Sequence, residues 1–374
     1  MAFILTDIKN KYVALRGYHT NRHLVVIESD DWGSIRMPSR EVFRELQRAG
    51  DSPEKDPFLS NDSLESEQDL ENLYSVLNSV TGKDGRPAVI TANFAVANPD
   101  FDRIDREKGI YHYEEIQKTY QRYYPDSDIY GTIQNGIEMG VFFPQLHCRE
   151  HMNVNRWMQA LKNGKKDVLT AFANHMIGIG ASFAQDNVFG YMDAFNTICS
   201  SDEELAQIVR DAASIFEKMF GFQSETFVAS CFVWNRALEK ELSQLGIRGI
   251  QSACWQNDPV GQGGAYKLKR RIHFTGEKTP FGQYYTVRNC SFEPAYKNDP
   301  QACAQHCLRE IEKSFSDRKP AIITSHRLNF ISEINPYNAK ANLEGLRELL
   351  VGIVNKYPDV EFVTTPELLK IMEN

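Results

Sequence analysis

The chain has 374 residues, of which 42% are hydrophobic and 25% charged, and its formal net charge is −8. These values are ordinary for a globular protein with a sizeable core, in one large domain or two smaller ones. The acidic balance argues against a general nucleic-acid-binding protein, which needs basic patches to meet phosphates. No apolar run approaches the ~20 residues of a membrane span and the start has no basic leader, so we expect no membrane association and a cytoplasmic location.

Seven cysteines are scattered along the chain. An odd number of cysteines in a chain of this size does not indicate a disulfide framework. Cys303 and Cys307 lie four residues apart in a helix-like segment. Because no second cysteine pair at zinc-site spacing accompanies them, we interpret both as ordinary thiols. The sequence leaves the oligomeric state unknown.

Short apolar runs rich in β-branched residues alternate with helical patterns along the chain. Strands are predicted at residues 24–27, 88–92, 141–146, 226–231, 248–252, 284–288, 321–325 and 360–363. Helices are predicted at residues 39–48, 66–80, 113–123, 154–161, 166–177, 202–220, 235–245, 300–314 and 339–357. Helices between successive strands favour a parallel sheet with crossovers, and seven or eight such units suit an α/β fold of the (β/α) barrel type.

No internal repeat or linker divides the chain, so a single domain over residues 1–374 is predicted. Polar or irregular segments near residues 50–63, 98–135, 178–200 and 256–283 are predicted as long loops over the C-terminal face of the barrel. The segment between residues 178 and 196 is rich in glycine and aromatic residues, which makes it a candidate substrate loop. The basic stretch at residues 267–271 is interpreted as a solvated loop.

Two adjacent carboxylates, Asp30 and Asp31, follow the first apolar run and precede the turn residues Gly33 and Ser34. Adjacent acids inside a strand would repel each other, so we place them at its end. The carboxyl ends of strands are where α/β sheets and barrels build their sites. Two acids there can divide the work, one holding a metal and one taking a proton. The alternative is a solvated turn whose aspartates cap the next helix.

The third predicted strand runs directly into His147 and His151, four residues apart. If the chain enters a helix there, both imidazoles lie on one face and can reach one ion. Two histidines and one carboxylate, which Asp31 could supply, are typical of a catalytic metal site. The alternative is a surface pair of histidines on a helix.

The predicted strand at residues 321–325 also ends in a histidine, His326. A single histidine at a strand end is commonly structural. Here it follows two other polar strand ends, and a histidine near its ordinary pKa can protonate a leaving group at neutral pH. We therefore predict His326 as a proton donor.

These stretches together resemble the polysaccharide deacetylases, a carbohydrate esterase family within the glycoside hydrolase/deacetylase superfamily. Residues 28–33 look like the family's Thr-Phe-Asp-Asp-Gly motif with one aromatic residue inserted, a form also similar to the YdjC-like deacetylases. His147 and His151 match the motif His-Ser/Thr-x-x-His, with Cys148 in place of the hydroxyl residue. His326 matches the last motif, an apolar strand ending in histidine.

The resemblance implies a distorted (β/α) barrel with about seven parallel strands. It implies that Asp30 is the general base that activates water, and that Asp31, His147 and His151 hold a divalent metal, usually zinc. His326 would be the general acid that protonates the leaving amine. The implied reaction is metal-dependent removal of an N- or O-acetyl group from an acetylated sugar or oligosaccharide.

The chain departs from the family at the middle motif, Arg-x-x-Pro-Tyr, whose arginine orients the base. Residues 228–234 occupy the equivalent strand end and contain no arginine. Another cation, Arg149 or Arg288, could take that role.

Four further residues are candidates for substrate binding. Trp32 and Trp234 could stack on sugar faces or fill the barrel mouth. Asn93, at the end of the second strand, could contact substrate or cap a turn, and Arg149 follows the first metal-ligand histidine.

Two other functions stay open. A metal-dependent glycosidase or phosphoesterase of related barrel fold is one, although retaining glycosidases use carboxylates from different strands ~5 Å apart. A degenerate barrel that binds carbohydrate without turnover is the other, and the missing arginine favours it.

Overall fold

The computed structural model describes residues 16–179, 190–261 and 266–374, so residues 180–189 of the predicted substrate loop and 262–265 lie outside it. One large sheet dominates the molecule, and all of its strand pairings are parallel. Its strands are β1 (Leu24–Trp32), β2 (Ile90–Ala95), β5 (Phe142–Cys148), β6 (Thr226–Val228), β7 (Gly249–Ser252), β10 (Tyr284–Val287), β11 (Cys290–Ser291), β12 (Ala321–His326) and β13 (Glu361–Phe362).

The spatial order is β10-β7-β6-β5-β2-β1-β12-β11, and β13 pairs with the start of β1. The two end strands, β10 and β11, are separated in sequence only by Arg288 and Asn289. The Arg288 N–H donates to Ser252 O on one side, and the Asn289 N–H donates to Ile322 O on the other. The sheet therefore curls on itself as a distorted (β/α) barrel. Counting β10 and β11 as one position and leaving out the short β13 gives the seven strands that were predicted.

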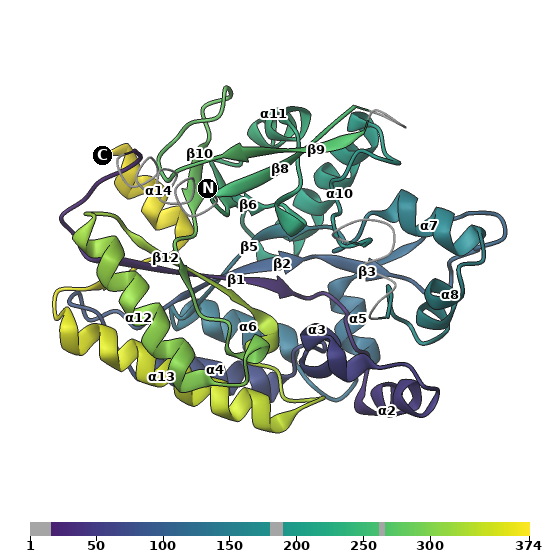
Figure 1. Cartoon of the computed structure of the whole chain (residues 1–374), viewed down its shortest axis with the longest axis horizontal. Helices are drawn as coiled ribbons and strands as arrows, with labels where there is room; N and C mark the ends of the chain where they lie inside the picture. The colour runs from purple at the N-terminus through teal and green to yellow at the C-terminus, as the bar shows by residue number, and fades with distance from the viewer. Residues whose placement is uncertain (1–15, 180–189, 262–265) are drawn as a thin grey trace, which may run out of the picture.

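Helices lie outside the sheet, as Figure 1 shows for α12 and α13 in the lower part of the view. The helices are α2 (Arg40–Arg48), α3 (Pro57–Asn61), α4 (Glu67–Asn78), α5 (Ile116–Tyr123), α6 (Ile129–Glu138), α7 (Val154–Lys162), α8 (Lys166–Ala173), α10 (Asp202–Phe220), α11 (Arg236–Gln244), α12 (Pro300–Ser316), α13 (Pro336–Lys356) and α14 (Thr365–Glu373). Among the described residues, none of these helices is both long and apolar enough to cross a bilayer.

The helix ends follow local sequence signals. Ser66, Ser201 and Thr364 each form a capping box with the acidic residue three positions on, which satisfies the exposed N–H groups at the start of the helix. The apolar faces of α4 and α10 join the strands in a large core that includes Leu70 and Phe216, whereas Leu368 of α14 packs in a smaller cluster with Leu24 and Ile322. Burial of this apolar surface is the main force that holds the barrel together.

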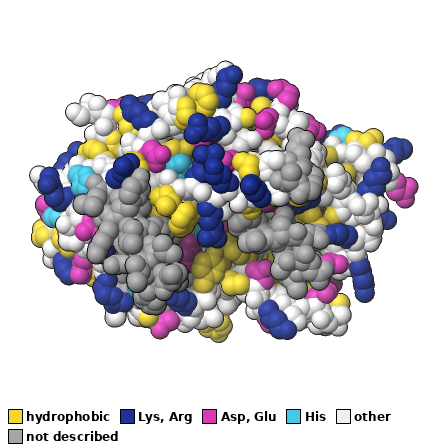
Figure 2. Space-filling model, turned by 45° about the horizontal axis from the view of Figure 1, so that its top comes forward, with side chains coloured by type: hydrophobic (Ala, Val, Ile, Leu, Met, Phe, Trp, Pro, Cys, Tyr) yellow, Lys and Arg dark blue, Asp and Glu magenta, His cyan; other side chains and the backbone are white. Residues whose placement is uncertain are grey.

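Three predicted loops contain regular structure, and the one near residues 50–63 holds helix α3. The segment near 98–135 holds the end of a small hairpin, β3 (Ala97–Pro99) with β4 (Tyr113–Glu115), followed by helices α5 and α6. The basic stretch at 267–271 lies on β9 (Lys267–Ile272), which pairs antiparallel with β8 (Trp255–Val260). Figure 2 brings this side of the molecule forward and shows dark blue Lys and Arg side chains gathered on it. The cross-strand pairing explains why charged residues form a strand here, since their side chains stay in solvent.

Candidate functional site

The end of β1 turns sharply at the two adjacent aspartates. Asp31 has φ +74° and Gly33 has φ +80°. A side chain at Gly33 would meet Ile116 Cδ1 at 2.1 Å and Ala95 O at 2.4 Å, so only glycine fits this position. The left-handed backbone at Asp31 lets the two neighbouring carboxylates meet different partners, which a regular strand would not allow.

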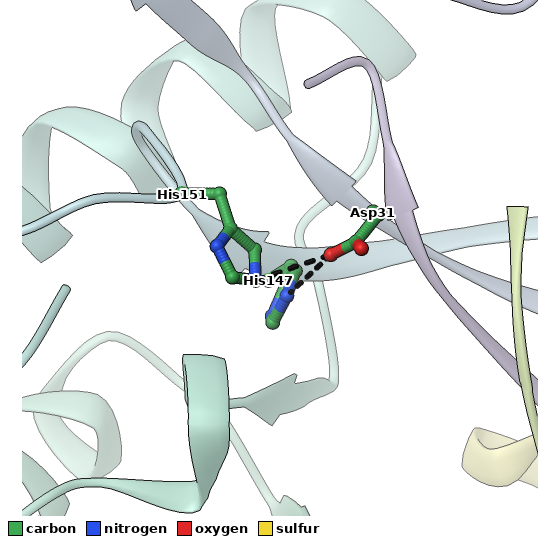
Figure 3. A group of neighbouring side chains, drawn as sticks. All are labelled: Asp31, His147 and His151. Atoms are coloured by element: carbon green, nitrogen blue, oxygen red, sulfur yellow. Dashed lines mark ion pairs between the residues drawn. The ribbon is translucent and has the colours of Figure 1, made fainter. Parts of the chain in front are cut away.

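Asp31, His147 and His151 converge on one point. Their ligand atoms all lie within 4.8 Å of one another, and all three residues are buried. The Nε2 atoms of His151 and His147 lie 3.1 and 3.6 Å from Asp31 Oδ1. Figure 3 shows both imidazole rings beside the Asp31 carboxylate, with Asp31 coming from a different strand. This is the predicted convergence of distant segments.

The two histidines reach this point without a helix, contrary to the prediction. His147 belongs to β5, His151 lies in the turn after it, and α7 begins only at Val154. Asn153 caps that helix by accepting a hydrogen bond from the Arg156 N–H. The tight turn after β5 replaces the helical i, i+4 spacing in bringing the rings together.

The donor set fits a divalent metal. Asp31 Oδ1 and His147 Nε2 are buried atoms without a hydrogen-bond partner, a costly arrangement unless a further group binds there. His147 Nδ1 lies 2.8 Å from Val228 O, which holds the proton on Nδ1 and leaves the Nε2 lone pair free. Burial lowers the pKa of His151 to about 4, against the opposing charge of Asp31, so the ring is neutral as a metal ligand requires.

Arg36 fixes the orientation of the Asp31 carboxylate. Its Nη2 donates to Asp31 Oδ2 at 3.0 Å, so the other oxygen, Oδ1, faces the two imidazoles. Burial alone would raise the pKa of Asp31, but Arg36 and His151 outweigh it and hold that pKa well below its usual range. The carboxylate is therefore ionised at neutral pH.

Asp30 has a separate set of partners. The Nη1 and Nη2 atoms of Arg288 each donate to one of its oxygens at 2.7 Å, and Asn93 Nδ2 donates to Oδ1 at 2.8 Å. Burial would raise the pKa of Asp30, but the bidentate Arg288 holds it well below its ordinary value. Asn93 is a positioning group for this carboxylate, and the cavity described below does not include it among its described lining residues.

Of the two cations considered in place of the missing motif arginine, Arg288 is the one that contacts Asp30. It is almost fully buried and also donates from Nε to Glu28 Oε2 at 2.7 Å. Arg149, the other candidate, points elsewhere: its guanidinium pairs with Glu150 and Asp211. Arg149 is also absent from the described cavity lining, which corrects its assignment to substrate binding.

His326 lies across from Asp30 and is paired with a second acid. Its Nδ1 lies 2.6 Å from Glu293 Oε1, and its Nε2 lies 4.0 Å from Asp30 Oδ2. Burial would lower the pKa of His326, but Glu293, followed by Asp31 and Asp30, raises it to about 9. The ring is therefore protonated at neutral pH, with Nε2 directed toward Asp30 and the cavity.

These groups line one cavity of about 410 Å³. Its polar side carries Asp30, Asp31, His147, His151 and His326. Its other side is largely apolar, formed by Ile35, Phe58, Leu59, Ile177, Met192, Ala229 and Phe232. A buried carboxylate, a protonated imidazole and three metal-type ligands around one small cavity can carry out hydrolysis.

Several solved structures share the general course of this chain. A 4-alpha-glucanotransferase from Thermococcus litoralis has a TM-score of 0.47 at 12% identity over 93% of this chain and 40% of that chain. A CE4 family pseudoenzyme from Bacillus anthracis has a TM-score of 0.42 at 10% identity, with 94% and 66% covered. The peptidoglycan deacetylase PdaC from Bacillus subtilis, in a mutant form, has a TM-score of 0.39 at 10% identity, with 94% and 91% covered.

Deacetylases are thus among the structural neighbours of this chain, and the chain spans less than half of the glucanotransferase. No protein-family model matches the sequence, and no curated protein matches it. Because these TM-scores are all below 0.5, the chemistry of the site itself must carry the functional argument. The similarity to YdjC-like deacetylases stays a prediction.

The two tryptophans expected to stack on sugars belong to the core. Trp32 is 1% exposed, packs edge-on against Phe142 and donates from Nε1 to Ser29 Oγ. Trp234 is also 1% exposed and donates to Glu239. Neither has surface to offer a ligand, so both assignments to substrate binding are corrected. In both places, burial of the large apolar ring stabilises the fold by more than burial of the single polar N–H of the indole costs.

The sequence analysis did not find Glu293 or Arg36. Glu293 stands two residues after the short strand β11, so an acid at a strand end was the available signal. A strand of two residues is too short to be detected from the alternation of apolar and polar residues. Arg36 follows the Asp31 turn, and nothing in its sequence context marks it as buried.

Proposed function

We propose that this protein is a metal-dependent hydrolase that removes an acetyl group from an acetylated sugar or oligosaccharide. One observation carries the proposal: three buried metal-type ligands, each with an unpartnered side-chain atom, adjoin an ionised carboxylate and a protonated imidazole. A cluster with a structural role alone would not need a base, an acid and a set of metal ligands around one cavity.

Each residue has a distinct task in this reaction. Asp31, His147 and His151 would hold the metal, which when bound supplies Lewis-acid polarisation of a carbonyl and acidifies water. Asp30 is ionised and fixed by Arg288, so it accepts the proton of the attacking water. His326 is charged and donates its Nε2 proton to the leaving nitrogen or oxygen, while Glu293 holds the imidazole in place.

Zinc is the metal we propose, because two neutral imidazoles and one carboxylate with open positions are its usual catalytic ligands. Arg36 donates to Asp31 Oδ2, so Oδ1 is the oxygen that Asp31 would offer to the metal. A cytoplasmic location stays a prediction.

The geometry disfavours a retaining glycosidase. That mechanism needs two carboxylates on either side of the bond, one of them protonated at neutral pH. Asp30 and Asp31 are adjacent in the chain, and the pKa of each is held low by an arginine. The alternative of a barrel that binds carbohydrate without turnover was favoured by the absence of the motif arginine. Arg288 can take the role of that arginine, because it donates to both oxygens of Asp30.

The test combines metal content with product release. Protein purified without chelator is analysed for metal, and acetate release from acetylated chito-oligosaccharides is measured with and without added zinc. We expect about one metal ion per chain and zinc-dependent acetate release. Bound metal without acetate release from any acetylated sugar would contradict the proposal, as would full activity after chelation.

A further inference from the structure

A second cavity shares His326 with the first, and Asp31, His147 and His151 are not among its described lining residues. It has a volume of about 590 Å³, and His326 and Glu293 line it together with residues from the start of α12. Its other described lining side chains include Ser291, Tyr296, Lys297, Asp299, His306 and Thr324. His326 therefore lines both a cavity with a largely apolar wall and one with mostly polar groups.

Tyr296 is the most accessible aromatic side chain beside the proposed acid. It is 42% exposed, although large hydrophobic side chains are usually covered. Its ring centroid lies 5.9 Å from that of Phe58 and 6.4 Å from that of His326. The Phe58 ring in turn meets His326 edge-on at 5.7 Å. Tyr296 thus lies beside His326 in the second cavity and is partly exposed.

The two cavities differ in the hydrogen-bonding groups that they can offer. In the first cavity, the buried atoms without a hydrogen-bond partner include Asp31 Oδ1 and His147 Nε2, which belong to the proposed metal site. In the second, the hydroxyls of Ser291 and Tyr296 and the ammonium of Lys297 have no partner among the described residues. A sugar ring needs several such partners when its hydroxyls leave water.

The charges of the second cavity are mixed. Glu293 and Asp299 are acidic, Lys297 is basic, and His306 is paired with Glu310. Such a balance selects neither an anion nor a cation, and it suits a neutral, hydroxylated ligand. A flat aromatic face beside mixed polar groups is the combination that binds a sugar ring, whose C–H face is apolar and whose edge is polar.

We propose that the second cavity is the sugar subsite, with Tyr296 as its stacking platform, and that the first cavity takes the acyl group. The inference rests on the proposed function for its orientation. The bond to be cleaved joins the acyl carbon to the leaving atom, and His326, which protonates that atom, lines both cavities. The hydroxylated leaving group then lies on the polar side and the acyl group on the apolar side.

The test measures binding of tri-N-acetylchitotriose by calorimetry in a background that carries Asp30→Asn, so that turnover does not consume the ligand. Tyr296→Ala should weaken the Kd about three- to tenfold, the range of one aromatic stacking contact. Tyr296→Trp should keep the Kd, and its indole emission should shift on titration. The titration of the background protein supplies the reference for this signal: Trp32, Trp157 and Trp234 are at most 1% exposed, and the partly exposed Trp255 is not among the described residues that line either cavity.

Tyr337→Ala is the matched control. Tyr337 is 85% exposed and is not among the described residues that line either cavity. Its Kd should equal that of the background protein. A wild-type Kd in Tyr296→Ala, or no binding of the trisaccharide to the background protein, overturns the sugar subsite. Binding that depends on Tyr296 without acetate release from the wild-type protein supports the subsite and overturns the proposed function instead.

Discussion

The pairing of His326 with Glu293 predicts how the activity depends on pH. Glu293 raises the pKa of His326 to about 9, against the lowering effect of burial, so the imidazole is a charged acid up to that pH. Activity should therefore fall as pH rises through about 9. Glu293→Gln removes the negative charge that does most to raise the pKa of His326. That pKa should then fall to roughly its ordinary 6.5 or below.

The magnitude follows from the fraction of protonated His326. At pH 8 a group of pKa 9 is roughly 90% protonated, whereas a group of pKa 6.5 is only about 3% protonated. Glu293→Gln should thus lose about 30-fold in kcat/KM at pH 8 and much less at pH 5.5. The assay is acetate release from an acetylated chito-oligosaccharide, followed from pH 5 to 10 for both proteins.

Glu203→Gln is the control, because Glu203 is a glutamate whose side chain is 80% exposed, paired with Arg210 on a distant helix. Its alkaline limit should match that of the wild type. An alkaline limit of Glu293→Gln that stays near 9, with activity reduced equally at every pH, would refute the role of Glu293 in holding the proton on His326. Glu293 would then act on the structure alone.

Four further predictions concern the remaining groups. His147→Ala should abolish metal retention in elemental analysis, whereas His19→Ala, at an exposed position, should keep the metal. Retained metal in His147→Ala would contradict the proposed set of ligands. Asp30→Asn should keep the metal and lose about 10²- to 10⁴-fold in kcat, and near-normal turnover would exclude it as the base. Arg288→Lys should keep the metal but lower kcat at least about tenfold, since a lysine cannot make the bidentate contact; unchanged kcat would show that orientation is unimportant. Trp32→Ala should lower the free energy of unfolding by about 3–5 kcal/mol in denaturant titration, and a loss below about 1 kcal/mol would contradict its place in the core.

Much of the barrel could be predicted because its strands are local patterns. Residues 24–27 and 321–325 are apolar runs that end in polar residues, and both became adjacent parallel strands with Asp30 opposite His326. Because sites gather at the carboxyl ends of parallel strands, Asp31, His147 and His151 were expected to meet. In the structure their ligand atoms lie within 4.8 Å of one another. The hairpin β8–β9 was missed because cross-strand pairing, not local apolarity, makes its charged strand.

By itself the sequence determined the residue types of the site and their positions at strand ends. The tertiary structure decided their roles. Arg288, some 258 residues from Asp30, contacts that carboxylate because the barrel closes between β7 and β12, whereas Arg149 pairs with Glu150 and Asp211. The burial of Trp32 was likewise decided by packing against Phe142. Spacing along a chain encodes local periodicity, whereas partners hundreds of residues apart are selected by how the whole sheet curls.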